Sequence, residues 1–207
     1  MRRFFLTGRI FIVVVFVLLF SLSVQAAGGE NLLLNPDFED NGGEWWSDAA
    51  YWEKGGNVSW VGVTTVNSHS QEWSFSVGND HGPGNASGCC LQVLRDPGNS
   101  TKLYPVSQGD VFTFSMWMAG EENHTGSAAV KIEFYGYDRR DGDSGPPLKS
   151  FSSAVHKGKL SYFKETVTAE APGETVSVAV VCLSEDNETG SGGSLVNFDD
   201  GEVVVNR

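Results

Sequence analysis

Two segments near the middle of the chain carry apolar residues at every second position. These residues are Phe112, Phe114, Met116 and Met118 in segment 111–119, and Val130, Ile132 and Phe134 in segment 128–138. Side chains in a β-strand point alternately to the two faces of its sheet, so a period of two places one face of each strand in a core. We therefore expect two long strands that each bury one face.

The rest of the chain has the pattern of short strands separated by turns. The 207 residues of the chain include 25 glycines, and aromatic residues make up 12% of the chain. No long helical pattern occurs. About ten strands at short spacing are typical of a sandwich or jelly roll. We therefore expect residues 28–207 to form one all-β domain, a single β-sandwich of the jelly-roll type.

Residues 1–27 have the pattern of a secretory signal peptide. Arg2 and Arg3 form a basic start, residues 10–20 are an apolar run, and residues 24–26 give a small-residue cleavage pattern. The apolar run is short for a membrane span, so an uncleaved anchor is the less favoured alternative. We expect an exported chain, either secreted or held in the periplasm or at the cell surface, with no membrane contact after cleavage.

The chain has a formal net charge of −12. Proteins that bind nucleic acid or anionic membrane surfaces use Lys and Arg, so this charge argues against both kinds of partner. A surplus of acids suits neutral partners or divalent cations, and it also simply keeps a protein soluble.

Both ends of the mature chain combine apolar strands with acidic residues. Residues 31–34 read as a short strand that leads into a polar turn with Glu39 and Asp40. Residues 195–205 read as a strand that carries the adjacent carboxylates Asp199 and Asp200. We expect these two ends to lie side by side in the sandwich.

Five motifs follow one another along nearly all of the mature chain. They are NLLLNPDFEDNGGEWW at 31–46, VSQGDVFTFSMW at 106–117, KIEFYGYDRRDG at 131–142, TVTAEAPG at 166–173 and NFDDGEV at 197–203. In this order they resemble the motifs of carbohydrate-binding modules of the family 4/9 type, which are galactose-binding-like jelly rolls. The resemblance implies the fold more strongly than a ligand, because the same fold also serves as a packing or adhesion module.

The resemblance also implies a structural calcium ion that ties the two chain ends together. Its ligands would be Glu39 and one of Asp199 and Asp200, with backbone carbonyls near Asp37 and Asn41. Calcium takes six to eight oxygen ligands, which carboxylates and loop carbonyls supply. Adjacent aspartates on a strand point to opposite faces, so we expect only one of the two to bind the ion. The alternative is that these acids are solvated or cap turns.

Polar and aromatic side chains occupy the non-core positions of the two long strands. Sugars present C–H faces that stack on aromatic rings and hydroxyls that need polar partners. The candidate carbohydrate-binding residues are Trp117, Tyr135, Tyr137 and Glu133, with Thr113 and Lys131 beside them. We expect these residues to share one cleft; the alternative for Trp117 is packing between strands.

The other tryptophans fall in loops or short strands. Trp52 and Trp73, together with Trp60, are expected either to form an aromatic platform at the rim of the binding surface or to fill the ends of the core. One of Trp45 and Trp46 is expected in the core, because this pair resembles the structural tryptophan of the family.

Catalysis has little support in the sequence. No nucleophile-elbow, phosphate-loop or zinc-protease motif occurs, and the four histidines lie in polar segments without metal-ligand spacing. The three cysteines allow one disulfide, between Cys182 and either Cys89 or Cys90. We therefore expect a monomeric module that recognises a polysaccharide or oligosaccharide without cleaving it. The alternative is a structural or adhesive extracellular protein that uses the same fold without affinity for sugar.

Overall fold

The computed structural model describes residues 29–79, 86–120, 126–139, 145–158, 161–186 and 194–207. The predicted signal peptide at 1–27 lies outside these residues. Within the described ranges, no helix has the length and apolar character that crossing a membrane requires.

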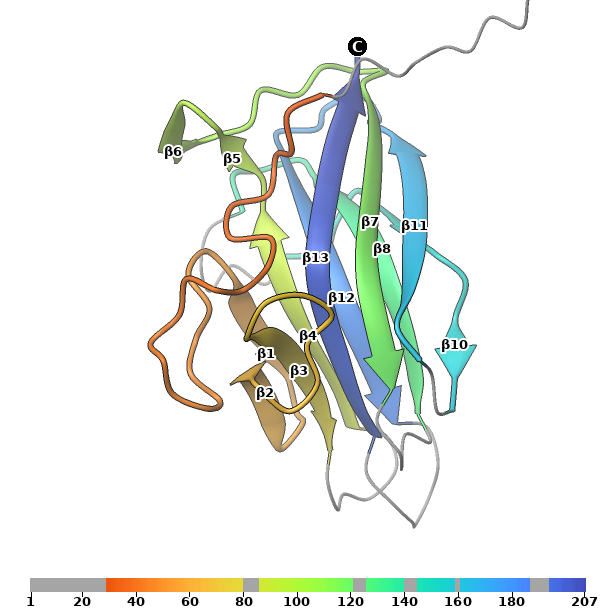
Figure 1. Cartoon of the computed structure of the whole chain (residues 1–207). Helices are drawn as coiled ribbons and strands as arrows, with labels where there is room; N and C mark the ends of the chain where they lie inside the picture. The colour runs from red at the N-terminus through yellow and green to blue at the C-terminus, as the bar shows by residue number, and fades with distance from the viewer. Residues whose placement is uncertain (1–28, 80–85, 121–125, 140–144, 159–160, 187–193) are drawn as a thin grey trace, which may run out of the picture.

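Two antiparallel sheets stack face to face, with a small hairpin beside them (Figure 1). The six-stranded sheet has the order β1 (Glu53–Gly56), β4 (Ala86–Val93), β12 (Ser177–Asp186), β8 (Ser127–Tyr135) and β10 (His156–Lys157), and β9 (Lys149–Ser152) also pairs with β8. The five-stranded sheet has the order β11 (Phe163–Glu170), β7 (Val111–Gly120), β13 (Ser194–Asn206), β3 (Ser74–Asn79) and β2 (Trp60–Thr64). The hairpin consists of β5 (Arg95–Asp96) and β6 (Asn99–Leu103). This architecture confirms the predicted all-β sandwich.

The core lies between the two sheets. All seven apolar residues predicted to face inward from segments 111–119 and 128–138 are fully buried in it. β12 adds Val178, Val180 and Cys182, which lie in register with core residues of β8. Burial of each large apolar side chain contributes about 1.5–3 kcal/mol, so this shared inner face holds the two sheets together.

Cys182 lies directly opposite Cys90 in the six-stranded sheet. Both side chains are buried, and all three cysteines are free thiols. Cys90 is therefore the neighbour of Cys182 on the core face, whereas Cys89 points to the outer face. Burial raises the pKa of Cys89 to about 11, which disfavours the reactive thiolate at neutral pH.

The two ends of the chain lie side by side, as predicted, but residues 31–34 do not form a strand (Figure 1). Only the Leu32 N–H joins a backbone ladder, donating to the carbonyl oxygen of Val203 at 2.9 Å. The Asn31 amide replaces the rest of the ladder. Its Nδ2 donates to the Gly201 carbonyl oxygen at 2.9 Å, and its Oδ1 accepts the Val203 N–H at 2.9 Å. Side-chain amides therefore satisfy backbone groups that a regular strand would pair.

The tryptophans are divided between the core and the surface. Trp52 and Trp73 belong to the core, which selects the core-filling alternative for both residues. The prediction that Trp45 or Trp46 lies in the core is wrong. Trp45 is 55% exposed, and Trp46 packs against Trp60 at the surface with a ring-centroid distance of 4.8 Å.

Candidate functional site

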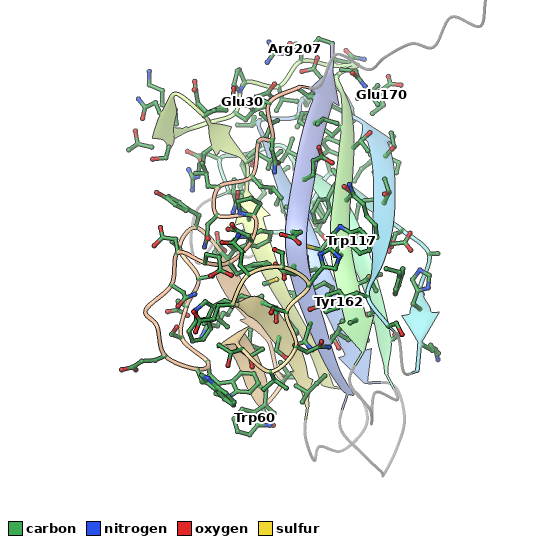
Figure 2. The ribbon with its side chains drawn as sticks, viewed as in Figure 1. Glu30, Trp60, Trp117, Tyr162, Glu170 and Arg207 are labelled. Atoms are coloured by element: carbon green, nitrogen blue, oxygen red, sulfur yellow. The ribbon has the colours of Figure 1, made fainter. Side chains whose placement is uncertain are left out.

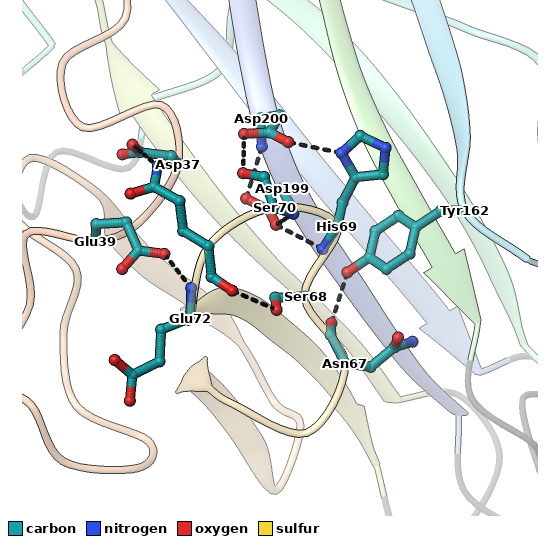
Figure 3. Close-up of polar contacts among 11 residues, drawn as sticks. Asp37, Glu39, Asn67, Ser68, His69, Ser70, Glu72, Tyr162, Asp199 and Asp200 are labelled. Atoms are coloured by element: carbon teal, nitrogen blue, oxygen red, sulfur yellow. Dashed lines mark hydrogen bonds and ion pairs between the residues drawn. The ribbon is translucent and has the colours of Figure 1, made fainter.

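The loop between β2 and β3, residues 65–73, is held against β13 by the two adjacent aspartates (Figure 3). Oδ2 of Asp199 accepts the backbone N–H groups of His69 and Ser70 at 2.8 and 3.0 Å. Oδ1 of Asp200 accepts the Ser70 hydroxyl at 2.7 Å, and its Oδ2 lies 2.6 Å from Nδ1 of His69. The aspartates therefore fix this loop over the outer face of the five-stranded sheet.

Both aspartates face the same loop, which corrects the prediction that they point to opposite faces. The register between β13 and β7 shifts between Asp199 and Glu202, and Asp200 has a positive φ of 48°. A β-bulge of this kind re-aims the side chain at the extra residue. The alternation rule fails here because the strand is locally irregular.

Acids from the opposite side hold the same loop. Oε1 of Glu39 accepts the N–H groups of Glu72 and Trp73 at 3.0 and 2.8 Å, and Asp37 accepts the Gln71 amide at 2.8 Å (Figure 3). Within the described residues, no three His, Cys, Asp or Glu side chains form a group that could hold a metal ion. Of the carboxylates predicted as calcium ligands, Glu39 and Asp199 accept backbone N–H groups of the loop, and Asp200 contacts the Ser70 hydroxyl and the His69 ring.

Asp199 is fully buried under this loop. Burial raises its pKa to about 7, and the neighbouring Asp200 charge adds to this effect. The N–H groups of Ser70, His69 and Asp200 counteract it in part. The ionised form of this carboxyl group is therefore less favourable here than in water.

Trp117 lies on the outer face of the five-stranded sheet, near Tyr162 (Figure 2). The His69 ring stacks on the Trp117 indole at 4.0 Å between centroids, with only 16° between their planes. The Tyr162 ring lies 5.2 Å from the His69 ring between centroids, and its hydroxyl donates to the Asn67 carbonyl oxygen at 2.6 Å. One face of the indole is thus already covered by the loop, and Trp117 is only half-exposed.

Glu133 and Tyr135 lie on β8, in the other sheet. Their side chains point away from the core, as those of Trp117 and Thr113 do from β7. Residues that point outward from two stacked sheets lie on opposite sides of a sandwich. The prediction that Trp117 and the two tyrosines share one cleft is therefore wrong. The period of two correctly gave the outward direction but could not assign the strands to sheets.

Tyr135 is not an open stacking platform, because it is only 4% exposed. The Arg139 guanidinium lies over its ring at 5.3 Å, and the edge of Tyr137 packs against it at 5.5 Å. Its hydroxyl donates to Glu133 at 2.5 Å. Burial, followed by this carboxylate, raises the pKa of the Tyr135 phenol.

An apolar strip covers the outer face of the six-stranded sheet around Tyr135. Its buried members are Leu91, Val93, Tyr135, Ala179 and Val181, and Cys89, Leu103 and Tyr137 pack against them. These residues come from three adjacent strands and the β5–β6 hairpin. The middle of the outer face of this sheet is therefore apolar. Tyr137, which follows β8, and Leu103 of the hairpin partly cover it.

A cavity of about 390 Å³ opens at one end of this strip. Its lining consists of Tyr51, Trp52, Glu53, Val93, Arg95, Ser100 and Thr101. Ligand pockets in proteins typically measure about 300–1,000 Å³ and combine an apolar wall with a few polar groups. Tyr51 is 54% exposed, so its ring is accessible, in contrast to the covered rings of Tyr135 and Trp117. We call this the Tyr51 cavity.

The polar wall of the Tyr51 cavity is fixed by an ion pair. Oε2 of Glu53 lies 3.2 Å from Nη1 of Arg139, and both side chains are mostly buried. The Arg139 N–H also donates to the Ser177 hydroxyl at 3.2 Å, which ties the chain after β8 to β12. Glu53 is therefore held in place against the six-stranded sheet.

The sequence did not identify Glu53, Arg95, Ser100 or Thr101 as site residues. They come from a short edge strand and a hairpin whose residues alternate weakly, and they are brought together only by the folded chain. Tyr51 carried one usable signal, because an aromatic residue in a polar, glycine-containing segment is more exposed than one in an alternating strand.

A scan against protein-family models finds no match, and a search of curated proteins finds none either. Solved structures do share the fold. The CBM22-1 xylan-binding domain of Paenibacillus barcinonensis Xyn10C is 16% identical, with a TM-score of 0.55 over 86% of this chain and 95% of that domain. An apo-form cyclase from Fischerella sp. is 14% identical, with a TM-score of 0.58 over 85% of this chain and 95% of the cyclase.

A third structure is the enzymatically active domain of tailspike protein 4 from bacteriophage CBA120, at 12% identity and a TM-score of 0.56. The match covers 85% of this chain but only 21% of the tailspike chain. At these identities the likeness establishes the fold alone. It confirms a jelly-roll β-sandwich like that of a carbohydrate-binding module, while the family 4/9 assignment stays a prediction.

Proposed function

We propose that this chain is an exported, non-catalytic carbohydrate-binding module whose ligand occupies the Tyr51 cavity. The observation that carries the proposal is the cavity itself. It joins an accessible aromatic ring to hydroxyl and charged side chains, at the end of an apolar strip. A sugar ring needs this combination, because its C–H face stacks on an aromatic ring while its hydroxyls form hydrogen bonds.

The outer face of the six-stranded sheet has a second cavity besides the Tyr51 cavity. A second, smaller cavity of about 150 Å³ includes Ala129, Lys131 and Leu183 in its lining, farther along β8 and β12. Val93 of the Tyr51 cavity lies opposite Ala179, whereas Leu183 lies opposite Ala129. Ala179 and Val181, which lie between the two cavities on β12, are buried, so we assign the ligand to the Tyr51 cavity alone.

The proposal leaves out catalysis for a chemical reason. Glycoside hydrolysis uses two carboxyl groups on either side of the scissile bond. Among the described residues that line the Tyr51 cavity, Glu53 is the single carboxylate, and it is paired with Arg139. Binding without cleavage is the function that this lining supports.

Affinity electrophoresis against soluble glucans, xylans, mannans and galactans tests the proposal. We expect retardation by at least one class, and we expect Tyr51→Ala to abolish it because the stacking surface is lost. Trp117 lies on the opposite side of the sandwich, so the Trp117→Ala variant should bind normally. Trp45→Ala is the matched control, since Trp45 is as exposed as Tyr51 but does not line the cavity.

Two results would contradict this assignment. Loss of binding in Trp117→Ala with normal binding in Tyr51→Ala would move the site to the five-stranded sheet, where Trp117 was first predicted to bind sugar. Absence of retardation by any polysaccharide, in a sample that melts cooperatively, would favour the structural or adhesive alternative.

Calcium binding is a separate proposal for the acids around the 65–73 loop. It is supported by the position of Glu39, Asp199 and Asp200 where the two chain ends meet, and by the burial of Asp199. A divalent cation beside a buried carboxylate would offset the cost of its ionisation. The proposal requires the acids to exchange backbone N–H donors for the ion.

Calcium binding predicts a higher Tm with added calcium, reversed by EGTA and lost in Glu39→Gln. Magnesium serves as the control, since it demands a smaller and more regular shell of oxygens than this loop offers. An unchanged Tm in calcium and in EGTA would contradict the proposal. The acids would then act only as acceptors for the N–H groups of the loop.

A further inference from the structure

Arg95 lines the Tyr51 cavity and has no acidic partner in the part of the chain that the structure describes. It lies on β5, where its backbone pairs with Leu103 of β6, and its side chain is half-buried in the cavity wall. Among the described residues, no carboxylate forms an ion pair with Arg95, and no hydrogen bond to its guanidinium is present. None of its five N–H donors is therefore used by a residue that the structure describes.

The two neighbouring acids have other partners than Arg95. Glu53 is in the same lining, but its carboxylate lies 3.2 Å from the Arg139 guanidinium. Asp96 follows Arg95 directly, but its Oδ1 accepts the Gly98 N–H at 2.8 Å within the hairpin turn. Among the described residues, Arg95 is thus the one charged side chain of the lining that forms no ion pair, on a chain whose formal net charge is −12.

We propose that the Tyr51 cavity selects a sugar unit that carries a carboxylate, a uronic acid, and that Arg95 determines this specificity. The inference rests on the proposed function of the cavity. A planar guanidinium matches a carboxylate with two parallel N–H···O bonds, which a neutral sugar cannot provide. The Tyr51 ring would stack on the sugar face, and the hydroxyls of Ser100 and Thr101 would contact the sugar hydroxyls.

Because the chain is negatively charged, an acidic polysaccharide is not attracted to it at long range. Recognition must come from the direct contact with Arg95. A chain with a large negative charge repels a polyanion at long range, and salt screens that repulsion beyond about 8–10 Å. A carboxylate that reaches the half-buried Arg95 is screened much less. Moderate salt is therefore expected to leave the binding of an acidic polysaccharide intact or to improve it.

The experiment compares polysaccharides that differ only in their carboxylates. Polygalacturonate, glucuronoxylan and alginate are each tested beside their methyl-esterified or carboxyl-reduced forms, by affinity electrophoresis and titration calorimetry in moderate salt. The proteins are the unchanged chain, Tyr51→Ala, Arg95→Gln and Arg95→Lys. Lys102→Gln is the matched control, because Lys102 is an exposed cation on the same hairpin that does not line the cavity. Dextran sulfate and dextran distinguish a carboxylate from any anion.

We expect at least one acidic polysaccharide to bind about ten times more tightly than its neutral form. A charge-assisted hydrogen bond usually produces a difference of this size. Arg95→Gln should weaken the binding of the acidic form about tenfold more than that of the neutral form, and so remove the difference. Arg95→Lys should retain part of the difference, since it keeps the charge but loses the two-bond geometry. Lys102→Gln should retain all of it.

Three results would overturn the inference while leaving the binding function in place. They are equal binding of the acidic and neutral forms, an equal loss for both forms in Arg95→Gln, and binding of dextran sulfate as tight as that of the acidic polysaccharide. The proposed function itself fails differently: no polysaccharide binds the unchanged chain, or Tyr51→Ala binds normally. The two sets of results are distinct, so each claim can fail without being mistaken for the other.

Discussion

Trp52→Ala is expected to lower the free energy of unfolding by about 3–5 kcal/mol, the usual cost of truncating a buried Trp or Phe. The Trp52 ring is 5% exposed and packs against Phe38 at 4.9 Å between centroids. Its Nε1 donates to the Asn35 carbonyl oxygen at 3.0 Å. The substitution removes both contacts and leaves a cavity beside Phe38 and Asn35.

The loss should extend to the Tyr51 cavity. Tyr51 directly precedes Trp52 and has a positive φ of 69°, which a tyrosine adopts only when its surroundings hold it there. Without the Trp52 anchor, we expect Tyr51 to lose its fixed position and ligand affinity to fall together with stability. If the cavity binds its ligand as proposed, Trp52 acts by positioning Tyr51 in addition to forming part of the wall.

Urea unfolding monitored by circular dichroism measures this prediction. Trp52→Phe should recover most of the stability, because it keeps the ring and loses one hydrogen bond that contributes about 1 kcal/mol. Trp45→Ala is the surface control and should change stability by less than about 0.5 kcal/mol, since Trp45 is 55% exposed. A small effect of Trp52→Ala would contradict its placement in the core.

Gly56→Ala is expected to produce a second large loss, about 3 kcal/mol, for a reason of backbone geometry. Gly56 ends β1 with a φ of +103°, and a Cβ atom there would lie 2.1 Å from the Ser87 carbonyl oxygen and 2.6 Å from the Gly88 Cα. These are backbone atoms of β4 and cannot rotate away. The expected loss combines about 1–2 kcal/mol of left-handed strain with about 1–3 kcal/mol of overpacking.

Gly43→Ala separates the two contributions. Gly43 also has a positive φ, +72°, but no heavy atom lies within 4 Å of the added Cβ. It should therefore cost only the strain of about 1–2 kcal/mol. Because β1 carries Glu53, Gly56→Ala should also weaken ligand binding, whereas Gly43→Ala should not. Equal losses of stability in the two variants would show that the close approach of β1 to β4 is not what requires glycine.

The sequence predicted the inward residues of the sandwich well because burial leaves a local signal. Phe112 and Phe114 on one strand and Ile132 and Phe134 on another repeat at every second position, and all four are buried. The same rule cannot say which sheet a strand joins, since that depends on pairing between distant segments. Trp117 and Tyr135 were both correctly expected to point outward, yet they do so on opposite sides of the molecule.

The parts of the candidate site that escaped prediction depend on irregular backbone. The bulge at Asp200 turns both aspartates toward one loop, and a rule based on regular strands excludes that arrangement. Tyr51 adopts a left-handed conformation that its own residue type disfavours, so its sequence does not predict that conformation. Arg95 joins the cavity through the β5–β6 hairpin, which lies beyond the end of β4. Neither spacing nor composition links Arg95 to Tyr51.

Hydrogen–deuterium exchange with and without the most strongly retarding polysaccharide fragment tests the central claim most directly. Binding at the Tyr51 cavity predicts slower exchange in peptides that cover β1 and the β5–β6 hairpin, residues 51–56 and 93–103, with no change in β7 and β11. Slower exchange confined to residues 111–120 and 161–170, around Trp117 and Tyr162, would contradict the account and place the binding surface on the five-stranded sheet.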